Sequence, residues 1–416
     1  MYKVADPDIK YTVAAQVGEN THGVMVVGDY TIARQLGHGS FGTVYEVKST
    51  STGARFAMKE YNKTSLRRRQ QSNLMRSSRG RGTMLRGRGA RGGMFDARRA
   101  MLQEQQQGEA SDPFYLIKRE LAVSKKLKHP NLVRVHEVLN DDEQDVLYLV
   151  IELCENGPVQ KVDPSSSSTT QLSPEHAHKY FVESLLGLEY LHENNIIHRD
   201  IKPDNLLLTS DNTLKIADFG ESTIVARHED KVTGSTGSPA FMAPELCQGI
   251  AEVSGGAADI WSLGVCLYSF IYGTLPFKGH STIEVLDSIS ESELKFPGPY
   301  NEQQQDLLSR MLDRSPDSRI RIHDIREHPW VTQDGAFALP SKEENCKHIV
   351  EPVTQEDVNN TVKHIYDIMP VIMAIAKLRR YRRRIKEKRE QEQCEKRQRE
   401  RELQQMQVDT EQPSHI

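Results

Sequence analysis

The chain has 416 residues, of which 37% are hydrophobic and 27% charged, as expected for a globular protein with one large or two small domains. Its formal net charge is −4, so the chain as a whole has no general attraction to nucleic acid. The five cysteines are scattered and form no Cys-x-x-Cys pair, which favours reduced thiols and a cytoplasmic or also nuclear location over a disulfide framework or a zinc site.

We expect no signal peptide and no membrane span. The first ten residues lack a basic start followed by an apolar run. The longest apolar patch, at 368–376, is much too short to cross a bilayer.

The first half of the chain predicts a small lobe built mainly of strands. Residues 1–28 show no strong periodicity and are interpreted as a lead-in, so the predicted domain spans 29–331. The segments 30–36 and 43–49 alternate and are rich in β-branched residues, and 54–61 is a third strand.

The turn between the first two strands carries a phosphate-binding pattern. Residues 37–44, GHGSFGTV, fit GxGxxGxV. A dinucleotide-binding turn would lead into a helix, whereas this one leads into a strand, so the glycines form a hairpin that can lie over phosphates. An ordinary glycine-rich hairpin is the alternative. Lys59 on the next strand is placed to reach the same phosphates.

An Arg/Gly-rich insert at 64–112 follows this strand. Residues 64–100 hold eleven arginines and one acid, Asp96. Because loop-closure entropy grows slowly with length, such an insert can protrude from a folded lobe. We interpret it as a cationic docking or regulatory arm; a tolerated loop and an RNA-binding segment are the alternatives.

Periodicity resumes in an amphipathic helix over 112–128, which ends before Pro130. It carries Glu120, the candidate ion partner of Lys59, for which a surface salt bridge is the alternative interpretation. Strands over 131–139 and 146–153 complete a lobe of five strands and one helix. The remainder is mainly helical, with helices predicted at 176–194, 260–273, 282–289, 303–312 and 322–330. The fold class is therefore α+β with two lobes.

The helical half contains the most specific motif. Residues 198–205, HRDIKPDN, fill every fixed position of HRDxKxxN. Asp200 can orient a substrate hydroxyl, and Lys202 can neutralise charge on a transferring phosphoryl group. Asn205 and Asp218, the latter in Asp-Phe-Gly, offer oxygen ligands to Mg²⁺.

With Ala-Pro-Glu at 243–245, these motifs resemble those of eukaryotic protein kinases from Tyr30 to Val331. The resemblance implies ATP and Mg²⁺ as cofactors, an Asp259 that braces the catalytic loop and an Arg319 that pairs with Glu245. Lys202 together with Ser238 is the serine/threonine-kinase pattern. The implied ATP-binding residues are Leu36, Gly37, Gly39, Gly42, Val44, Ala57, Lys59, Glu152 and Cys154, with Ile151 as gatekeeper. Thr233, Ser235 and Thr236 are candidate phosphosites that could supply an anion to Arg199, and Glu229 and Asp230 are alternative anions.

Longer runs, such as IIHRDIKPDNLLL and GSPAFMAPE, are similar to calcium/calmodulin-dependent protein kinase kinases and their fungal and plant relatives. That resemblance implies an upstream kinase, which phosphorylates activation-loop threonines of other kinases, including AMP-activated-type kinases. The family also carries an insert at the position of 64–112. Here glycine replaces the family's proline, so the insert is expected to be more flexible.

After a loop-like linker at 332–355, the segment 356–390 resembles the family's autoinhibitory and calmodulin-binding stretch. Its basic and apolar residues suit the groove of calmodulin, a candidate partner. A helix docked on the large lobe and a nuclear-localisation-like run are the alternatives. Residues 391–416 are predicted to be a charged helical tail with a disordered end.

Two other functions compete with the upstream-kinase interpretation. One is a serine/threonine kinase with unrelated substrates and no calmodulin control. The other is a pseudokinase scaffold, whose signature would be loss of Lys59, Asp200, Asn205 or Asp218; all four residues are present.

Overall fold

The computed structural model describes residues 9–12, 15–19, 23–39, 42–62, 115–141, 146–162, 167–226, 230–234, 237–248, 250, 252–299 and 301–347. All of these fall within the first of two compact units of the chain, Met1–Asp141 with Asp145–Thr361. The insert at 64–112, the segment 356–390 and the tail 391–416 lie outside the described residues. The hypotheses on docking, calmodulin and RNA binding through these segments therefore stay predictions.

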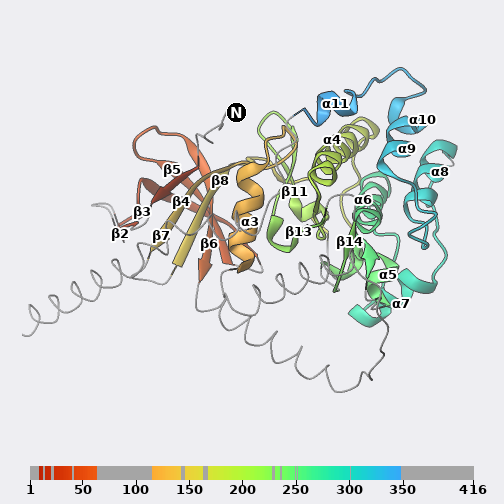
Figure 1. Cartoon of the computed structure of the whole chain (residues 1–416), viewed down its shortest axis with the longest axis horizontal. Helices are drawn as coiled ribbons and strands as arrows, with labels where there is room; N and C mark the ends of the chain where they lie inside the picture. Colours follow the sequence, from red (N-terminus) through yellow and green to blue (C-terminus); the bar gives the residue numbers. More distant parts are fainter. Residues whose placement is uncertain are drawn as a thin grey trace, which may run out of the picture. The chain divides into compact units, whose positions relative to one another are not determined.

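The small lobe is built on one eight-stranded sheet with the order β1-β7-β8-β6-β5-β4-β3-β2. The five predicted strands are β4 to β8, and the predicted helix is α3, which contacts β7 and lies beside the sheet in Figure 1. The bounds are β1 Lys10–Thr12, β2 Val17–Glu19, β3 Met25–Val27, β4 Tyr30–Gly39, β5 Gly42–Ser49, β6 Arg55–Asn62, α3 Tyr115–Lys126, β7 Val135–Asp141 and β8 Val146–Glu152.

Three further strands come from the segment interpreted as a lead-in, and they extend both edges of the sheet. β1 pairs in parallel with β7, while β3 pairs with β4 at the opposite edge. A buried carboxylate on β7 bonds β1 and β4. Glu137 accepts hydrogen bonds from Thr12 Oγ1 at 2.6 Å and from Tyr30 OH at 2.7 Å. Strands of three residues are too short to show a periodicity of two, so the sequence analysis did not predict them.

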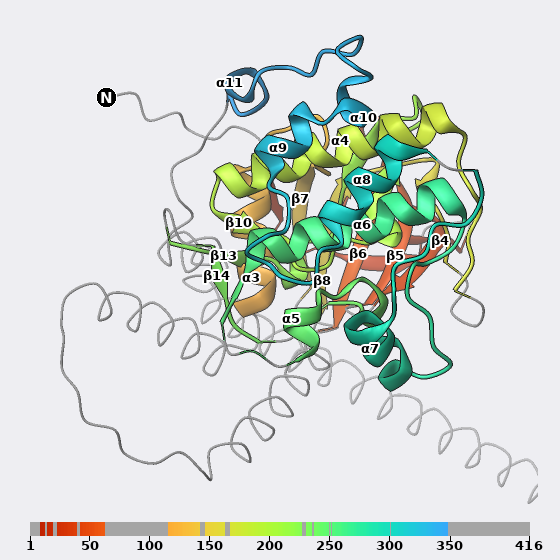
Figure 2. The same cartoon turned by 90° about the vertical axis from the view of Figure 1, so that its right-hand side faces the viewer.

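The large lobe is mainly helical and holds the largest core cluster, with the helices α4 and α6 at its centre. Figure 2 shows α4, α6, α8 and α9 lying side by side. The bounds are α4 Pro174–Glu193, α5 Pro244–Cys247, α6 Gly255–Tyr272, α7 Thr282–Glu291, α8 Glu302–Met311, α9 Ile322–Glu327, α10 Pro329–Thr332 and α11 Lys342–Asn345. The short strands are β9 Gly157–Pro158, β10 Ile196–Ile197, β11 Leu206–Leu208, β12 Leu214–Ile216, β13 Thr223–Ile224, β14 Lys231–Val232 and β15 Val253–Ser254.

The two central helices begin where a serine can cap them. Ser173 accepts a hydrogen bond from His176 N–H and is followed by Pro174, a residue suited to the first helical position. Ser254 accepts one from Ala257 N–H at 3.2 Å. Along α4 and α6, long runs of buried residues form the faces that pack together. Phe181, Leu185 and Trp261 have no exposed surface.

Part of the predicted linker packs on the large lobe. Ser341 and Glu344 form a reciprocal capping box that begins α11. Asn345 then donates to Leu186 O at 3.0 Å and to Glu189 Oε2 at 2.8 Å, both on α4. The segment up to Cys346, which is 4% exposed, is therefore attached to the domain.

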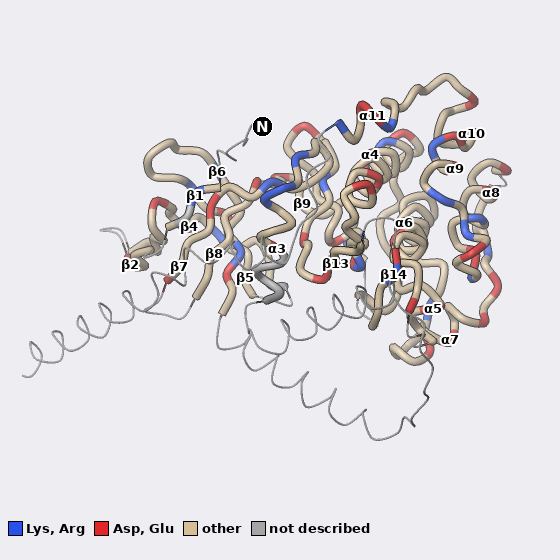
Figure 3. Tube along the Cα trace, in the orientation of Figure 1, with Lys and Arg blue, Asp and Glu red and all other residues tan. Residues whose placement is uncertain are grey.

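Acidic and basic residues alternate along the described trace, so neither lobe carries a charge of one sign only, as Figure 3 shows. Among the helices that the structure describes, none has the length and apolarity needed to cross a membrane.

Candidate active site

The glycine-rich hairpin is formed by the paired ends of β4 and β5. Gly37 pairs with Val44 and Gly39 with Gly42, while the tip, 40–41, lies outside the described residues. Gly42 has φ 153°, and a Cβ there would lie 1.8 Å from the carbonyl oxygen of Glu60 on β6. The last glycine of the motif is therefore required by close packing of the hairpin on the next strand.

Three elements bring charged groups together below this hairpin. Lys59 on β6 places Nζ 2.8 Å from Asp218 Oδ1 and 3.5 Å from Glu120 Oε1 on α3. Tyr61, also on β6, donates its hydroxyl to Glu120 Oε1 at 2.9 Å and to Oε2 at 2.8 Å. The predicted Lys59–Glu120 pair is thus a buried ion pair, because Lys59 is 8% and Glu120 5% exposed.

Burial and mutual attraction compete in this cluster. Burial disfavours the charged ammonium, but the carboxylates of Glu120 and Asp218 outweigh it, so the pKa of Lys59 is raised well above its usual value. Burial also opposes the Asp218 carboxylate, and Lys59 overcomes it to lower the pKa of Asp218. Lys59 and Asp218 are therefore both charged at neutral pH.

Asp218 is held by the backbone that follows it. The residue adopts the left-handed conformation with φ 66° and precedes a 3-10 helix, η3 (Phe219–Glu221), that contacts α3. Phe219 is 3% exposed and packs edge-on against His198 with ring centroids 5.5 Å apart. His198 Nε2 in turn lies 3.1 Å from Ala217 O. Burial of Phe219 between α3 and the catalytic loop therefore directs Asp218 toward Lys59.

Asp200 is surrounded by hydrogen-bond donors. Ser238 donates to Asp200 Oδ1 from both its N–H and its hydroxyl at 3.0 Å. Lys202 Nζ lies 2.7 Å from Asp200 Oδ2 and 2.8 Å from Ser238 Oγ, and Asn205 Nδ2 donates to the carbonyl and to Oδ2 of Asp200. The structure thus brings Asp200, Lys202 and Asn205 together. Ser238 joins them to the activation segment, the stretch from Asp-Phe-Gly to Ala-Pro-Glu (218–245).

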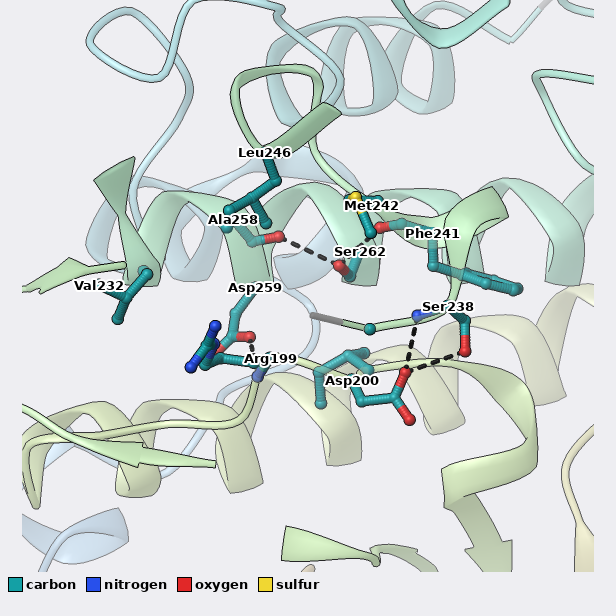
Figure 4. Close-up of a pocket in the computed structure, with 13 residues that line it drawn as sticks. Arg199, Asp200, Val232, Ser238, Phe241, Met242, Leu246, Ala258, Asp259 and Ser262 are labelled. Carbon is teal, nitrogen blue, oxygen red and sulfur yellow. Dashed lines mark hydrogen bonds between the residues drawn. The ribbon is translucent and has the colours of Figure 1, made fainter. Parts of the chain in front are cut away.

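Asp259 on α6 holds the catalytic loop, residues 198–205, through hydrogen bonds. It lines a small cavity, which Figure 4 shows in close-up. Asp259 accepts from the N–H groups of His198 at 2.9 Å and Arg199 at 2.8 Å, and its Oδ2 lies 2.9 Å from His192 Nε2. Burial alone would raise the pKa of Asp259, but the bonds from His192 and from the backbone lower it. The brace implied by the resemblance is therefore the buried, charged carboxylate of Asp259, which has three hydrogen-bond partners.

The guanidinium of Arg199 contacts the chain that follows Asp-Phe-Gly. It donates to Thr223 Oγ1 at 2.8 Å, to Thr233 O at 3.0 Å and to Gly234 O at 3.1 Å. Asp230, an alternative anion in the sequence analysis, lies instead beside Ser254. Of the candidate phosphosites only Thr233 is described, and Ser235, Thr236 and the other alternative anion, Glu229, lie outside the described residues.

The residues predicted to bind ATP outside the hairpin lie on β4, on β6 and at or just after the end of β8. Ala57 pairs with Ile151, and Glu152 ends β8 with its side chain 2.9 Å from Lys215 Nζ. Burial raises the pKa of the Cys154 thiol to about 12, so this cysteine stays protonated. Leu36 is 41% exposed on β4. Leu36, Ala57 and Glu152 therefore lie on strands of the sheet that also carries the glycine-rich hairpin.

The donor set suits a magnesium ion bound with a nucleotide. Asp218 offers a carboxylate, and the amide nitrogen of Asn205 is the atom that bonds Asp200, which leaves its amide oxygen for a cation. Hard cations such as Mg²⁺ prefer such oxygen ligands. The two residues predicted as metal ligands therefore fit that role chemically.

Tyr61 and His192 contact the candidate site residues but were absent from the sequence predictions. Tyr61 could have been found, because it follows Lys59 by two residues in a strand and must share its face. His192 lies at the end of α4, and only the tertiary fold brings it to Asp259.

Comparison with known proteins gives a consistent result. The protein kinase domain model matches residues 80–331. A calcium/calmodulin-dependent protein kinase kinase of Emericella nidulans is 35% identical over 84% of this chain and 67% of its own length. One of Caenorhabditis elegans is 40% identical over 65% of this chain and 50% of its own, and the serine/threonine-protein kinase ppk34 of Schizosaccharomyces pombe is 34% identical over 75% and 85%. The chain thus matches about half of the nematode relative's length and about two thirds of the Emericella one's.

Proposed function

The chain belongs to the protein kinase family, as a serine/threonine kinase similar to the calcium/calmodulin-dependent protein kinase kinases, and from this premise we propose that it is an upstream kinase. Its acceptors are activation-loop threonines of other protein kinases, of the AMP-activated or calmodulin-dependent type. The similarity to calcium/calmodulin-dependent protein kinase kinases supports this choice of acceptor. One contact supports the phosphate transfer that it requires: Lys59 Nζ of the small lobe lies 2.8 Å from Asp218 Oδ1 of the large lobe. This contact joins the phosphate-binding and metal-binding candidates in one site.

The small-lobe residues bind and orient ATP. Gly37 to Val44 cover its phosphates, and Lys59 contacts them while Glu120 holds the lysine. The backbone of Glu152 and Cys154 receives the adenine. Asn205 and Asp218 hold Mg²⁺, which when bound neutralises charge developing on the phosphates.

The large-lobe residues act on the acceptor. Asp200 accepts the hydrogen bond of the serine or threonine hydroxyl and takes its proton as the oxygen–phosphorus bond forms and the bond to ADP breaks. Lys202, 2.7 Å from Asp200, stabilises the negative charge of the moving phosphoryl group. Ser238 links this step to the activation segment, because its N–H and hydroxyl both orient Asp200.

The acceptor class can be tested with an AMP-activated-type kinase domain that has been inactivated at its own catalytic lysine. We expect incorporation of phosphate at its activation-loop threonine, and loss of incorporation when that threonine is replaced by alanine. Asp200→Asn of the present chain controls for contaminating kinases. Phosphorylation of a generic serine peptide without phosphorylation of the kinase domain would instead favour a serine/threonine kinase with unrelated substrates.

Calmodulin control is tested in the same assay. The full chain is assayed with calcium-loaded calmodulin, with calcium alone and with neither. Control through the segment 356–390 predicts stimulation by calmodulin that disappears when this segment is deleted. Equal rates in all three conditions would remove calmodulin from the list of partners.

We infer a cytoplasmic location, with the nucleus as a second compartment. All four cysteines within the described residues, Cys154, Cys247, Cys266 and Cys346, are free thiols. Imaging of the tagged full chain, with and without the basic run 379–384, tests whether that run directs the protein to the nucleus.

A further inference from the structure

Tyr61 occupies an unusual place between the two members of the Lys59–Glu120 pair. It lies two residues after Lys59 on β6, so both side chains leave the same face of the strand. Its ring has no exposed surface and packs in a cluster with Leu121 of α3 and Leu149 of β8. The ring is therefore fixed by neighbours from both the helix and the sheet.

The Tyr61 hydroxyl lies closer to the Glu120 carboxylate than the Lys59 ammonium does. The Tyr61 hydroxyl lies 2.9 Å from Oε1 and 2.8 Å from Oε2 of Glu120, whereas Lys59 Nζ lies 3.5 Å from Oε1. Lys59 also lies 5.1 Å from the centroid of the Tyr61 ring. The Tyr61 side chain thus bonds the carboxylate through its hydroxyl and also lies against the ammonium of Lys59.

We propose that Tyr61 is a positioning residue, which holds the Glu120 carboxylate beside Lys59 so that the ammonium is oriented toward the nucleotide phosphates. A donor bound to both oxygens restricts rotation of a carboxylate, and it ties α3 to β6 before any nucleotide binds. Because Glu120 is held from one side, Lys59 can approach Asp218 to 2.8 Å without losing Glu120. The proposal rests on the proposed ATP-dependent activity but not on the identity of the protein acceptor.

Tyr61→Phe removes the hydroxyl and keeps the ring with its packing, so it tests what the hydroxyl contributes. Binding of ATP with Mg²⁺ and binding of adenosine are measured on the folded protein. A misplaced Lys59 loses phosphate contacts only, so we expect the Kd of ATP to rise about tenfold and the Kd of adenosine to stay unchanged. The KM for ATP rises accordingly.

The sheet contains a matched control. Tyr30 donates its hydroxyl to the buried carboxylate of Glu137 at 2.7 Å, and it lies at the end of β4 opposite the glycine-rich hairpin. Tyr30→Phe makes the same chemical change and should lower the melting temperature without changing the ratio of ATP to adenosine affinity. This comparison separates positioning from the general loss of a buried hydrogen bond.

A double-mutant cycle supplies the second measurement. In a Glu120→Gln background the carboxylate is already lost, so adding Tyr61→Phe should weaken ATP binding by less than twofold more. The proposal is overturned if Tyr61→Phe resembles Tyr30→Phe, with a lower melting temperature and an unchanged affinity ratio. It is also overturned if the two effects multiply independently. Failure of the wild-type chain to bind ATP would instead refute the proposed function.

Discussion

Two buried ion pairs in this molecule have contrasting surroundings. In the large lobe, Arg319 meets Glu245 through two parallel bonds of 2.8 and 2.9 Å, and its remaining donors reach the carbonyl oxygens of Ala257 and Asp313 at 2.8 Å. In the small lobe, Lys59 is shared between Glu120 at 3.5 Å and Asp218 at 2.8 Å. Glu245 and backbone carbonyl oxygens therefore use the donors of Arg319. Lys59 on β6 instead contacts Glu120 on α3 and Asp218 at unequal distances.

The difference indicates what each pair does. A bidentate arginine with every side-chain group bonded fixes the Ala-Pro-Glu segment against α6 and has no capacity left for a ligand. A lysine with rotatable donors and a point charge can exchange one carboxylate for phosphate oxygens. We therefore expect the large-lobe pair to govern stability and the small-lobe cluster to govern phosphate transfer.

The largest effect is expected at the acceptor side of the transfer site. Asp200→Asn keeps the shape of the side chain but removes the base, so kcat should fall by about 10³-fold, or about 4 kcal/mol of transition-state stabilisation. Single-turnover transfer of labelled phosphate measures it. Asp204→Asn, an exposed position in the same loop, serves as the control and should retain activity. Substantial turnover by Asp200→Asn would contradict the assignment.

Next in size is the stability of the large lobe. Arg319→Met leaves the Glu245 carboxylate buried without its partner and should lower the free energy of unfolding by about 3–5 kcal/mol. Urea unfolding measures the loss. The double variant Arg319→Met with Glu245→Leu removes both charges and should recover much of the stability. Equal losses in the single and double variants would show that packing, not charge, dominates this site.

A pH dependence sharpens the role of Asp259. Its pKa is lowered in the folded state, so its carboxylate stabilises the fold above the unfolded value of 3.8, and this contribution is lost as the pH falls through the folded value. Asp259→Asn should therefore cost about 2 kcal/mol at pH 7 and progressively less below about pH 4. Urea midpoints of both proteins at pH 7 and pH 3 test this. A difference that is independent of pH would argue against a charged brace.

The smallest effect is expected at the N-terminal strand. Thr12→Val removes the hydroxyl that donates to Glu137 at 2.6 Å and keeps the shape, so it should cost about 1 kcal/mol of stability. Phosphate transfer should be unchanged, because Glu137 does not contact the transfer site. A loss of activity with normal stability would instead connect this edge of the sheet to catalysis.

Motifs and periodicity predicted the fold class and the longer helices of the large lobe. The structure also brings Asp200, Lys202 and Asn205 together. These features depend on short-range spacing, which the sequence displays directly. The helix predicted at 322–330 is instead two short helices, α9 and α10, which are separated at His328.

Long-range contacts that no motif marks were not predicted. The strand β1 has three residues and pairs with β7 across more than a hundred positions. Likewise, nothing in the sequence indicated that the carbonyl oxygens of Thr233 and Gly234 accept hydrogen bonds from Arg199. No pattern in side-chain identity reveals a backbone acceptor.

The contrast between the two ion pairs can be tested most directly by measuring phosphate transfer and unfolding on Lys59→Met and Arg319→Met together. We predict that Lys59→Met abolishes transfer and lowers the urea midpoint less than Arg319→Met does, because the buried Glu120 carboxylate keeps its hydrogen bonds from the Tyr61 hydroxyl. Arg319→Met should unfold at a much lower urea concentration but retain transfer in its folded fraction. Substantial transfer by Lys59→Met, normalised to folded protein, would contradict the account.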